Sequence, residues 1–289
     1  MEKTIFPAGE LDNIEFVVIF AKYQDKWVYC WHKRRKSFEH PGGHVEAGET
    51  ALQAAKRELF EESGITDCEM IPLWDYEQPW DDGVRKNNGR VYAAIARSLG
   101  ELPESEMGKV ELFDTLPDNY TYDREEALRD LERAQAILEL KEKQNKAIEC
   151  FRKGMHCSQS VLFAFAEECG ITEETAFRLG SCFGSGMRKG NVCGACTGAL
   201  MVLGLLFGES RMGDREERQR SNKINDEMMN RFAQANGTCI CNELLGCDVS
   251  TPEGVQYARS TGLFRDFCPE MVTSAVEILD GIIREMREL

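Results

Sequence analysis

Three glutamates lie close together in one short segment of the chain. Glu58, Glu61 and Glu62 are spaced i, i+3 and i+4, so a helix would place them on one face. They would repel one another without positive charge, and Arg57 can reach Glu61 at i+4 and Glu49 through space. The remaining negative charge suits a hard divalent cation such as Mg²⁺, which prefers oxygen ligands and keeps waters for a phosphate substrate. An isolated cluster of this kind is more often a solvated acidic helix face. The residues around the cluster therefore decide whether it is a metal site.

Cysteine is the second residue type that can do chemistry here. The chain has twelve cysteines, and ten of them fall in the last 140 residues. Because stable disulfides are rare in cytosolic proteins, this density indicates metal, cluster or redox chemistry. Cys193-Gly-Ala-Cys196 can chelate a metal or form a reversible disulfide, and it opens an apolar helix whose positive end favours thiolate.

The other cysteines divide into two groups. Cys157 and Cys268 each begin a predicted helix, and Cys241 follows Cys239 after one intervening residue. Four thiolates can bind an iron–sulfur cluster or Zn²⁺, and alternatively pairs can cycle between dithiol and disulfide. Free cysteine is also a common small core residue, which is the favoured interpretation for the singly placed ones; these are Cys150, Cys169, Cys182 and Cys247.

The segments that must position the glutamates alternate between strand and helix. Strands are predicted at residues 14–21, 26–33, 69–74, 90–96 and 110–113, with a hairpin turn at 23–25. Residues 48–62 have a helical composition, and Gly64 is placed to end that helix. The glutamates therefore lie on a helix within an α/β pattern.

The character of the chain changes from residue 123. Residues 123–152 are charged and nearly free of Gly and Pro, so we expect the closing helix of one domain and the opening helix of the next. Further helices are predicted at 158–169, 173–182, 194–207, 215–235 and 269–289, and convincing strands are absent. The cysteines therefore belong to an all-α region, and the two predicted domains span residues 1–137 and 138–289.

Composition limits the class of protein. With 289 residues, 42% hydrophobic and 29% charged, the chain can build two folded cores, which excludes disordered and collagen-like classes. No apolar run reaches the length of a membrane span, and the N-terminus lacks a secretory pattern, so we expect a cytoplasmic protein without membrane contact. The net charge of −15 argues against direct nucleic-acid binding. It remains compatible with a small anion held by a metal.

The surroundings of the glutamates carry a complete motif. The pattern G-x5-E-x7-R-E-U-x-E-E-x-G-U, in which U is a bulky aliphatic residue, is met from Gly43 through Glu49 and Arg57 to Ile65. This segment resembles the Nudix hydrolase signature, and the resemblance covers roughly residues 10–135. It implies an α/β/α Nudix sandwich and hydrolysis, dependent on Mg²⁺ or Mn²⁺, of a nucleoside diphosphate linked to a moiety X. Nucleoside triphosphates, including an oxidised-guanine type, are the substrates we expect.

The same resemblance implies roles for individual residues. Glu58, Glu61 and Glu62 are expected to ligate the metal, with the carbonyl of Gly43 as an additional ligand. Arg57 and Glu49 are expected to form the ion pair that orients the helix. The general base is open between Glu62 and Glu106, because Nudix proteins often place a late-loop glutamate near the metals. Substrate stacking is open among several aromatic residues, each of which can equally be core; these are Trp27, Trp31, Trp74, Tyr76 and Trp80.

The cysteine-rich half resembles a second family. Cys193-Gly-Ala-Cys-Thr-Gly198 matches the C-G-A-x-x-G motif of a small family of redox-active proteins with four separated cysteines. The four positions correspond to Cys157, Cys193, Cys241 and Cys268, and the resemblance covers about residues 140–289. Cys196 and Cys239 are extras beyond these four. The resemblance implies redox chemistry and leaves metal, cluster and dithiol alternatives open.

These observations give one main hypothesis and two competing ones. The main hypothesis is a two-domain protein in which a Nudix pyrophosphohydrolase is fused to an all-α cysteine-rich domain. The first alternative is a redox or metal sensor whose Nudix half binds a nucleotide and hydrolyses it weakly. The second makes the helical half an electron-transfer partner of another protein. Intact motif glutamates favour catalysis, because a module that only binds has no need of them.

Overall fold

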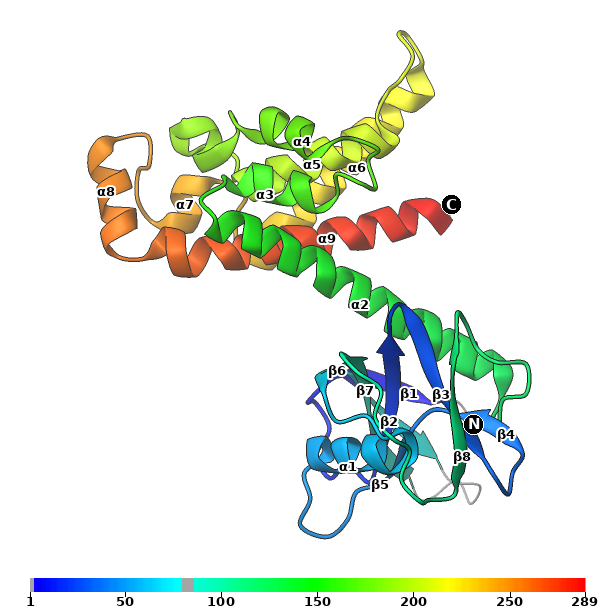
Figure 1. The fold of residues 1–289 in the computed structure, drawn as a ribbon. Coiled ribbons are helices and arrows are strands. Elements are labelled where there is room, and N and C mark those ends of the chain that lie inside the picture. Colours follow the sequence, from blue (N-terminus) through cyan, green and yellow to red (C-terminus); the bar gives the residue numbers. More distant parts are fainter. Residues whose placement is uncertain (1–2, 80–85, 289) are drawn as a thin grey trace. The chain divides into compact units, whose positions relative to one another are not determined.

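The computed structural model describes residues 3–79 and 86–288. The chain forms two compact units, Met1–Ile137 and Leu138–Leu289. Strands belong to the first unit and helices fill the second, as Figure 1 shows. This division into an α/β half and an all-α half is the fold class that the sequence predicted.

The first unit is built on one mixed sheet. Its strands follow the order β1-β6-β7-β2-β3-β4, with β5 added beside β2 and β8 beside β3. Neighbouring strands are antiparallel except β2 and β7, which run parallel from the Phe16–Gly89 pair to the Lys22–Ile95 pair. The strands are β1 (Thr4–Pro7), β2 (Phe16–Tyr23), β3 (Lys26–His32), β4 (Ser37–Glu39), β5 (Gly42–His44), β6 (Cys68–Pro79), β7 (Lys86–Ala96) and β8 (Met107–Phe113).

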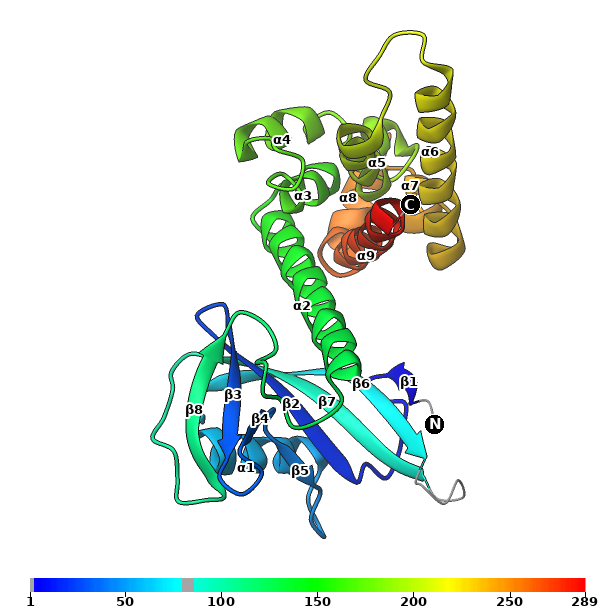
Figure 2. The same ribbon diagram turned by 90° about the vertical axis from the view of Figure 1, so that its right-hand side faces the viewer.

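Helices cover both faces of this sheet. Helix α1 (Ala51–Ser63) packs its Ala54, Ala55 and Leu59 against one face, and the first part of α2 (Arg124–Arg152) lies on the other (Figure 2). There the Arg133 guanidinium lies 5.5 Å from the centre of the Trp74 ring. The sandwich buries apolar side chains on both faces, which is why the strands read as nearly continuous hydrophobic runs.

Helix α1 has well-defined ends. Thr50 and Gln53 form a capping box, in which the Thr50 hydroxyl accepts from the Gln53 amide at 3.2 Å and the Gln53 side chain accepts from the Thr50 amide at 2.8 Å. The helix ends at Gly64, whose φ of 76° is the left-handed conformation that glycine adopts most easily. Gly64 thus ends the helix as the sequence predicted. These caps fix the rotation of the helix, and therefore the direction in which its glutamates point.

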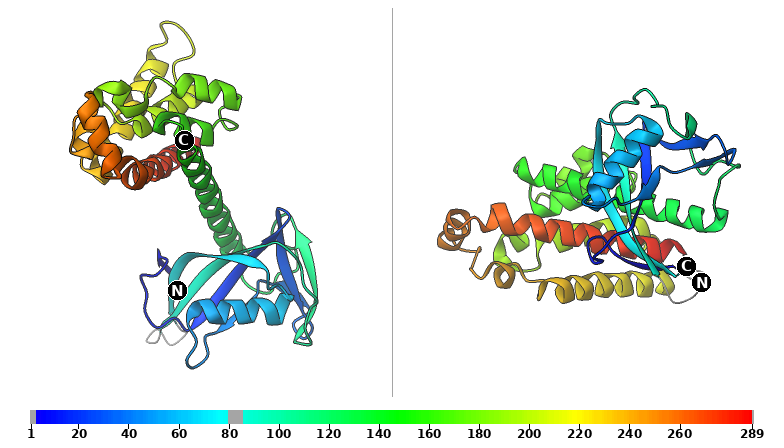
Figure 3. Two further views of the ribbon diagram at one scale, coloured as in Figure 1. Left: turned by 60° about the vertical axis from the view of Figure 1, so that its left-hand side comes forward. Right: turned by 90° about the horizontal axis from the view of Figure 1, so that it is seen from below.

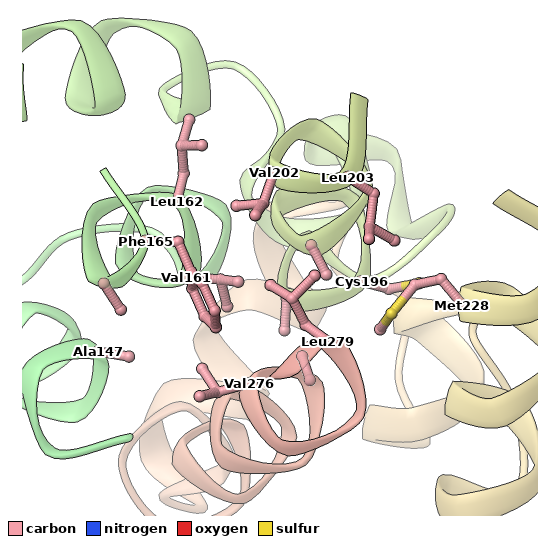
Figure 4. Packing of buried hydrophobic residues seen from close by; sticks show 14 of the residues in the cluster. Ala147, Val161, Leu162, Phe165, Cys196, Val202, Leu203, Met228, Val276 and Leu279 are labelled. Atoms are coloured by element: carbon pink, nitrogen blue, oxygen red, sulfur yellow. The ribbon is translucent and has the colours of Figure 1, made fainter. Parts of the chain in front are cut away.

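The second unit is a helical bundle around a large apolar core, with a smaller apolar cluster formed by Cys241, Leu245, Val249 and Ala258 (Figure 3). Figure 4 shows the central packing, in which side chains of α3, α5, α6 and α9 meet, together with Phe165, which directly follows α3. The helices are α3 (Cys157–Ala164), α4 (Glu173–Gly180), α5 (Gly194–Phe207), α6 (Arg215–Asn236), α7 (Cys241–Leu245), α8 (Pro252–Ser260) and α9 (Cys268–Glu288), with short turns η1 (Gly186–Gly190) and η2 (Leu263–Phe267).

Some elements differ from the sequence prediction. Helix α2 is one continuous helix where a closing and an opening helix were expected, because nothing in residues 124–152 breaks the backbone hydrogen bonding. The short elements β1, β4, β5, α7 and α8 were not predicted, since three to nine residues carry little periodic signal. Among the described residues, no helix is long and apolar enough to cross a membrane.

Candidate functional site

Arg57 organises the carboxylates at one end of α1. Its guanidinium donates to both oxygens of Glu49 at 2.9 and 3.0 Å, to Glu58 at 2.8 Å and to Glu61 at 3.2 Å. It also donates to the His44 carbonyl at 3.0 Å, which ties α1 to strand β5. The two-pronged pair with Glu49 is the main reason why the pKa of Arg57 is raised, and it lowers the pKa of Glu49. Arg57 is therefore a fixed positive centre among three carboxylates.

Glu62 is the most buried of the motif glutamates. Its side chain accepts a hydrogen bond from the Gly42 amide at 2.9 Å, and only 7% of the residue is exposed. Burial, together with the nearby charges of Glu58, Glu39 and Glu106, raises the pKa of Glu62 to about 8, although the Gly42 hydrogen bond opposes this rise. A carboxylate held in this way is stabilised by any cation that enters the cluster.

Glu106 comes to the same place from the loop before β8. Its carboxylate lies 3.3 Å from Nε2 of His32 on β3. Nδ1 of His32 accepts from the Arg34 and Arg35 amides, at 3.2 and 3.3 Å, which holds the imidazole ring in place. The structure brings the late-loop glutamate and the α1 glutamates together, because the Glu106 charge is among those that raise the pKa of Glu62.

Glu39 belongs to this cluster, and sequence reasoning missed it. It ends β4 with 3% of its surface exposed, pairs with Arg35, and leaves its Oε1 without a hydrogen-bond partner among the described residues. Its Oε1 lies 4.0 Å from Nε2 of His32. A charged residue directly before His40-Pro41-Gly42-Gly43, at a position where a strand should be apolar, was the available signal.

Gly43 lies directly against Glu58. A Cβ at position 43 would overlap the Glu58 carboxylate, so only glycine leaves that carboxylate where it is. Gly43 is paired with Val17 in the β2–β5 ladder, which fixes its carbonyl beside the helix. Burial raises the pKa of Glu58, and the Arg57 contact opposes that rise.

The donor set fits a hard cation. Within residues 3–79 and 86–288, no three His, Cys, Asp or Glu side chains are arranged to hold a metal ion. The chemistry of the cluster is nevertheless that of a magnesium site, because its donors are carboxylate oxygens and their negative charge exceeds what Arg57 balances. The buried, unpartnered Oε1 of Glu39 points to the same excess.

A 340 Å³ cavity lies beside Gly42 and Gly43. Its aromatic lining comes from β2, β6 and the segment before α2, and includes Phe16, Phe20, Tyr76, Tyr120 and Tyr122. Of the aromatic residues that the sequence suggested for substrate stacking, Tyr76 lines this cavity. Trp27 and Trp74 are 4% and 2% exposed and belong to the core, and Trp31 packs on Phe38. Trp80 lies outside the described residues.

In the second unit, four cysteines line one 670 Å³ cavity. They are the four that the sequence matched to the family positions: Cys157, Cys193, Cys241 and Cys268. Cys196 does not join them. It is fully buried in the helical core, where its thiol donates to Sδ of Met229 at 3.5 Å and burial raises its pKa to about 12 (Figure 4). The two cysteines of the Cys193–Cys196 motif therefore point to different surroundings.

Comparison with protein families matches both halves of the chain. Residues 14–131 match the NUDIX domain, and residues 155–282 match the family described as "Putative redox-active protein (C_GCAxxG_C_C)". The first range contains every carboxylate of the cluster, and the second contains all four cavity cysteines.

Individual relatives match the first half. The Bacillus subtilis "Putative 8-oxo-dGTP diphosphatase YtkD" is 32% identical over 110 residues, which cover 37% of this chain and 67% of that protein. The 8-oxo-dGTP diphosphatase of Haemophilus influenzae is 50% identical over 46 residues, covering 15% of this chain and 34% of that protein. The chain thus spans about two thirds of one curated relative and about a third of three others.

Among solved structures, a Bacillus subtilis pyrophosphohydrolase, BsRppH, is 23% identical, with a TM-score of 0.40 over 46% of this chain and 90% of that one. The sequence matches decide the family. Through its N-terminal half the chain belongs to the Nudix hydrolase family, and its C-terminal half matches the model of the C_GCAxxG_C_C family.

Proposed function

We propose that the first unit is a pyrophosphohydrolase that depends on a divalent metal and cleaves a nucleoside diphosphate linked to a moiety X. The observation that carries this proposal is the carboxylate cluster around Glu62. The charges of three glutamates, Glu58, Glu39 and Glu106, act on one buried carboxyl, and Arg57 and Arg35 balance part of that charge. Such a cluster is unfavourable unless it serves a cation.

Mg²⁺ or Mn²⁺ would be held by Glu58, Glu61 and Glu62, with the Gly43 carbonyl as a further ligand. When bound, the metal supplies charge neutralisation on the phosphate oxygens and lowers the pKa of a bound water. Arg57 and Glu49 hold α1 in register with β5, so the three carboxylates keep their direction. Their task is positioning, because both are already paired with each other.

The proton of the attacking water needs an acceptor, and two residues of this chain are placed for it. Glu62 is a candidate because its carboxyl lies beside the Gly42 amide within the glutamate cluster. Glu106 is a candidate because it is largely exposed and lies 3.3 Å from Nε2 of His32 at the edge of the same cluster. The pH profiles of kcat in Glu62→Gln and Glu106→Gln distinguish the two candidates. Only the loss of the general base removes the fall of kcat at low pH.

The substrate we propose is a nucleoside triphosphate, possessing a base that enters the aromatic cavity. His40 supports this, since its ring lies 4.2 Å from that of Phe20 and its Nε2 has no hydrogen-bond partner among the described residues. The oxidised-guanine type is the first candidate, because two relatives carry the name 8-oxo-dGTP diphosphatase.

A nucleotide panel tests this proposal. Purified full-length protein is incubated with ordinary and oxidised nucleoside triphosphates, with Mg²⁺, with Mn²⁺ or with a chelator. We expect nucleotide hydrolysis that requires metal and favours one base. A complete lack of hydrolysis across the panel with either metal would refute the proposal.

For the second unit we propose redox or metal chemistry at the four cavity cysteines. The supporting observation is that four thiols from four separate segments line one cavity. An iron–sulfur cluster or Zn²⁺ and a dithiol pair are the alternatives, with electron transfer to a protein partner as a possible use of either. Anaerobic purification, metal analysis and a count of free thiols before and after reduction separate them.

A further inference from the structure

The four cavity cysteines are brought together by two kinds of local structure. Cys157 and Cys268 stand at the first positions of α3 and α9. Cys193 and Cys241 are joined through the backbone, since the Cys193 amide donates to the Cys239 carbonyl at 2.8 Å and the Cys241 amide donates to the Asn191 carbonyl at 2.7 Å. The thiols thus lie on well-fixed backbone, although the segments are far apart in sequence.

Cys157 and Cys193 are in direct contact. Gly194 follows Cys193, and a Cβ at Gly194 would overlap the sulfur of Cys157. The backbone next to Cys193 is therefore in contact with that sulfur. A hydrogen bond from the Cys193 thiol is the main reason why the pKa of Cys157 is lowered to about 7. The same contact, together with burial, raises the pKa of Cys193. One proton is therefore shared, with Cys157 as the thiolate and Cys193 as the thiol.

The loop before α5 contains strained backbone next to Cys157. Ser185, Met187 and Arg188 all have positive φ, at 52°, 55° and 58°. A positive φ is unfavourable for a non-glycine residue, and such backbone strain concentrates at functional sites. Here the strain has a visible result, because the backbone of Ser185 hydrogen-bonds to the Cys157 sulfur.

The cavity lining is otherwise largely apolar, and four of its five charged side chains are arginines. Arg152, Arg188 and Arg259 line it, and none of them has an ion-pair partner within the described part of the chain. Arg265 also lines it and is paired with Asp266 at 2.7 Å. The acidic group of the cavity is thus balanced, and three positive charges remain to receive an anion in a protein whose net charge is −15.

We propose that this cavity is a thiol–disulfide exchange site in which Cys157 attacks, and Cys193 resolves, a small disulfide that carries negative charges. The proposal deepens the redox function proposed for the second unit and does not depend on the hydrolase. The cavity, the adjacent pair of sulfurs and the unpaired arginines carry it together. The arginines set the class of substrate, since they favour an anionic disulfide over a neutral or cationic one.

The exchange balances in two steps. The Cys157 thiolate attacks one sulfur of the small disulfide, forming a mixed disulfide and releasing one small thiolate, which takes a proton from water. Cys193 then attacks the Cys157 sulfur, forming the Cys157–Cys193 disulfide, and its proton goes to the second small thiol as it leaves. Two electrons pass from the protein dithiol to the small disulfide, which is reduced to two thiols.

The test uses full-length, reduced protein and two probes of opposite charge. Oxidised glutathione is the anionic disulfide and cystamine is the cationic one, and peptide mass spectrometry identifies which cysteines become linked. We expect the Cys157–Cys193 disulfide to form, at least tenfold faster with oxidised glutathione than with cystamine. Cys193→Ser should stop the reaction at a mixed disulfide on Cys157.

Matched variants test the role of the cavity charge. Arg259→Ala should lower the rate with oxidised glutathione about fivefold or more and leave the rate with cystamine unchanged or higher. Arg178→Ala is the control, because Arg178 is exposed on α4 and, among the residues that the structure describes, forms an ion pair only with Glu174 of its own helix. Circular dichroism of each variant confirms that the bundle is folded.

Two results separate this inference from the broader redox proposal. Equal rates with the two probes, or a disulfide between other cysteines, would overturn the inference and leave the redox function standing. Unreactive thiols in a protein that carries a stoichiometric metal would overturn the inference in favour of the metal alternative. A thiol count that never changes with oxidation, in metal-free protein, would overturn both.

Discussion

At the scale of residues, the account rests on side chains whose burial changes their chemistry. Glu62 was identified from spacing alone, because i, i+3 and i+4 positions share a helix face. Its burial and its neighbour Glu39 were not predictable, since they depend on how β5 lies against α1 and on where β4 places the Glu39 charge. Likewise the sequence supplied the four cysteine positions, but the adjacency of Cys157 and Cys193 follows from how α3 and the loop before α5 meet.

His40 gives a prediction about acid stability. Burial lowers the pKa of its imidazole to about 3, so the folded protein holds it neutral, while the unfolded chain binds a proton below about pH 6.5. Stability is therefore lost as pH falls from 6.5 toward 3, with a slope of up to about 1.4 kcal/mol per pH unit from this group. His40→Gln should remove that part of the slope in denaturant unfolding between pH 6 and 4. An identical slope in the variant would contradict the neutral buried imidazole.

Cys157 gives a prediction about alkylation. With a pKa of about 7, its labelling by iodoacetamide should rise through pH 7 and become level near pH 8, as the thiolate fraction saturates. Cys169 is an internal control in the same mass spectra, because burial raises its pKa to about 11 and its labelling should stay low. Cys193→Ala should move the Cys157 midpoint to higher pH, since the strongest stabilising contact is lost. A midpoint that stays at pH 7 would argue against the shared proton.

At the scale of elements, long periodic segments were predictable and short ones were not. Helix α1 has the caps Thr50 and Gly64 and a clear apolar face, so its extent follows from sequence. Strand β5 has only three residues, two of them glycine, and offers no pattern. It is nevertheless the element that places the Gly43 backbone beside Glu58, so part of the candidate site depends on a strand without sequence signal.

The two glycines of β5 should respond differently to alanine. In Gly43→Ala the added Cβ meets the end of the flexible Glu58 side chain, which can move, so we expect a fold of near-normal stability with turnover reduced at least tenfold. In Gly42→Ala it meets the backbone of Val17 and Val18, so the free energy of unfolding should fall by about 1–3 kcal/mol. Denaturant unfolding and kcat measured on both variants check this. Equal loss of stability in the two would contradict the assignment.

At the scale of the whole molecule, the chain holds two kinds of chemistry on two separate cores. The change from strands to helices and the concentration of cysteines after residue 150 were visible in the sequence, because residue types and periodicity differ between the halves. The continuity of α2 was not visible in the sequence, because a charged helical segment does not indicate whether it forms one helix or two.

Separate cores predict separate activities. No residue of the carboxylate cluster lies in the second unit, and no cavity cysteine lies in the first. In the full-length protein, Cys157→Ser should therefore leave nucleotide turnover within about twofold, and Glu62→Gln should leave disulfide formation unchanged. A large effect of either substitution on the other activity would instead support the alternative of a nucleotide-regulated redox sensor.

The central claim is that the α1 glutamates hold a catalytic metal. The most direct measurement is the rate of nucleoside triphosphate hydrolysis with Mg²⁺, compared among wild type, Glu61→Gln, Glu62→Gln and the surface control Glu174→Gln. The account predicts that the first two substitutions lower kcat by about two orders of magnitude or more, with folding intact, and that the control changes nothing. Undiminished turnover in both Glu61→Gln and Glu62→Gln would contradict it.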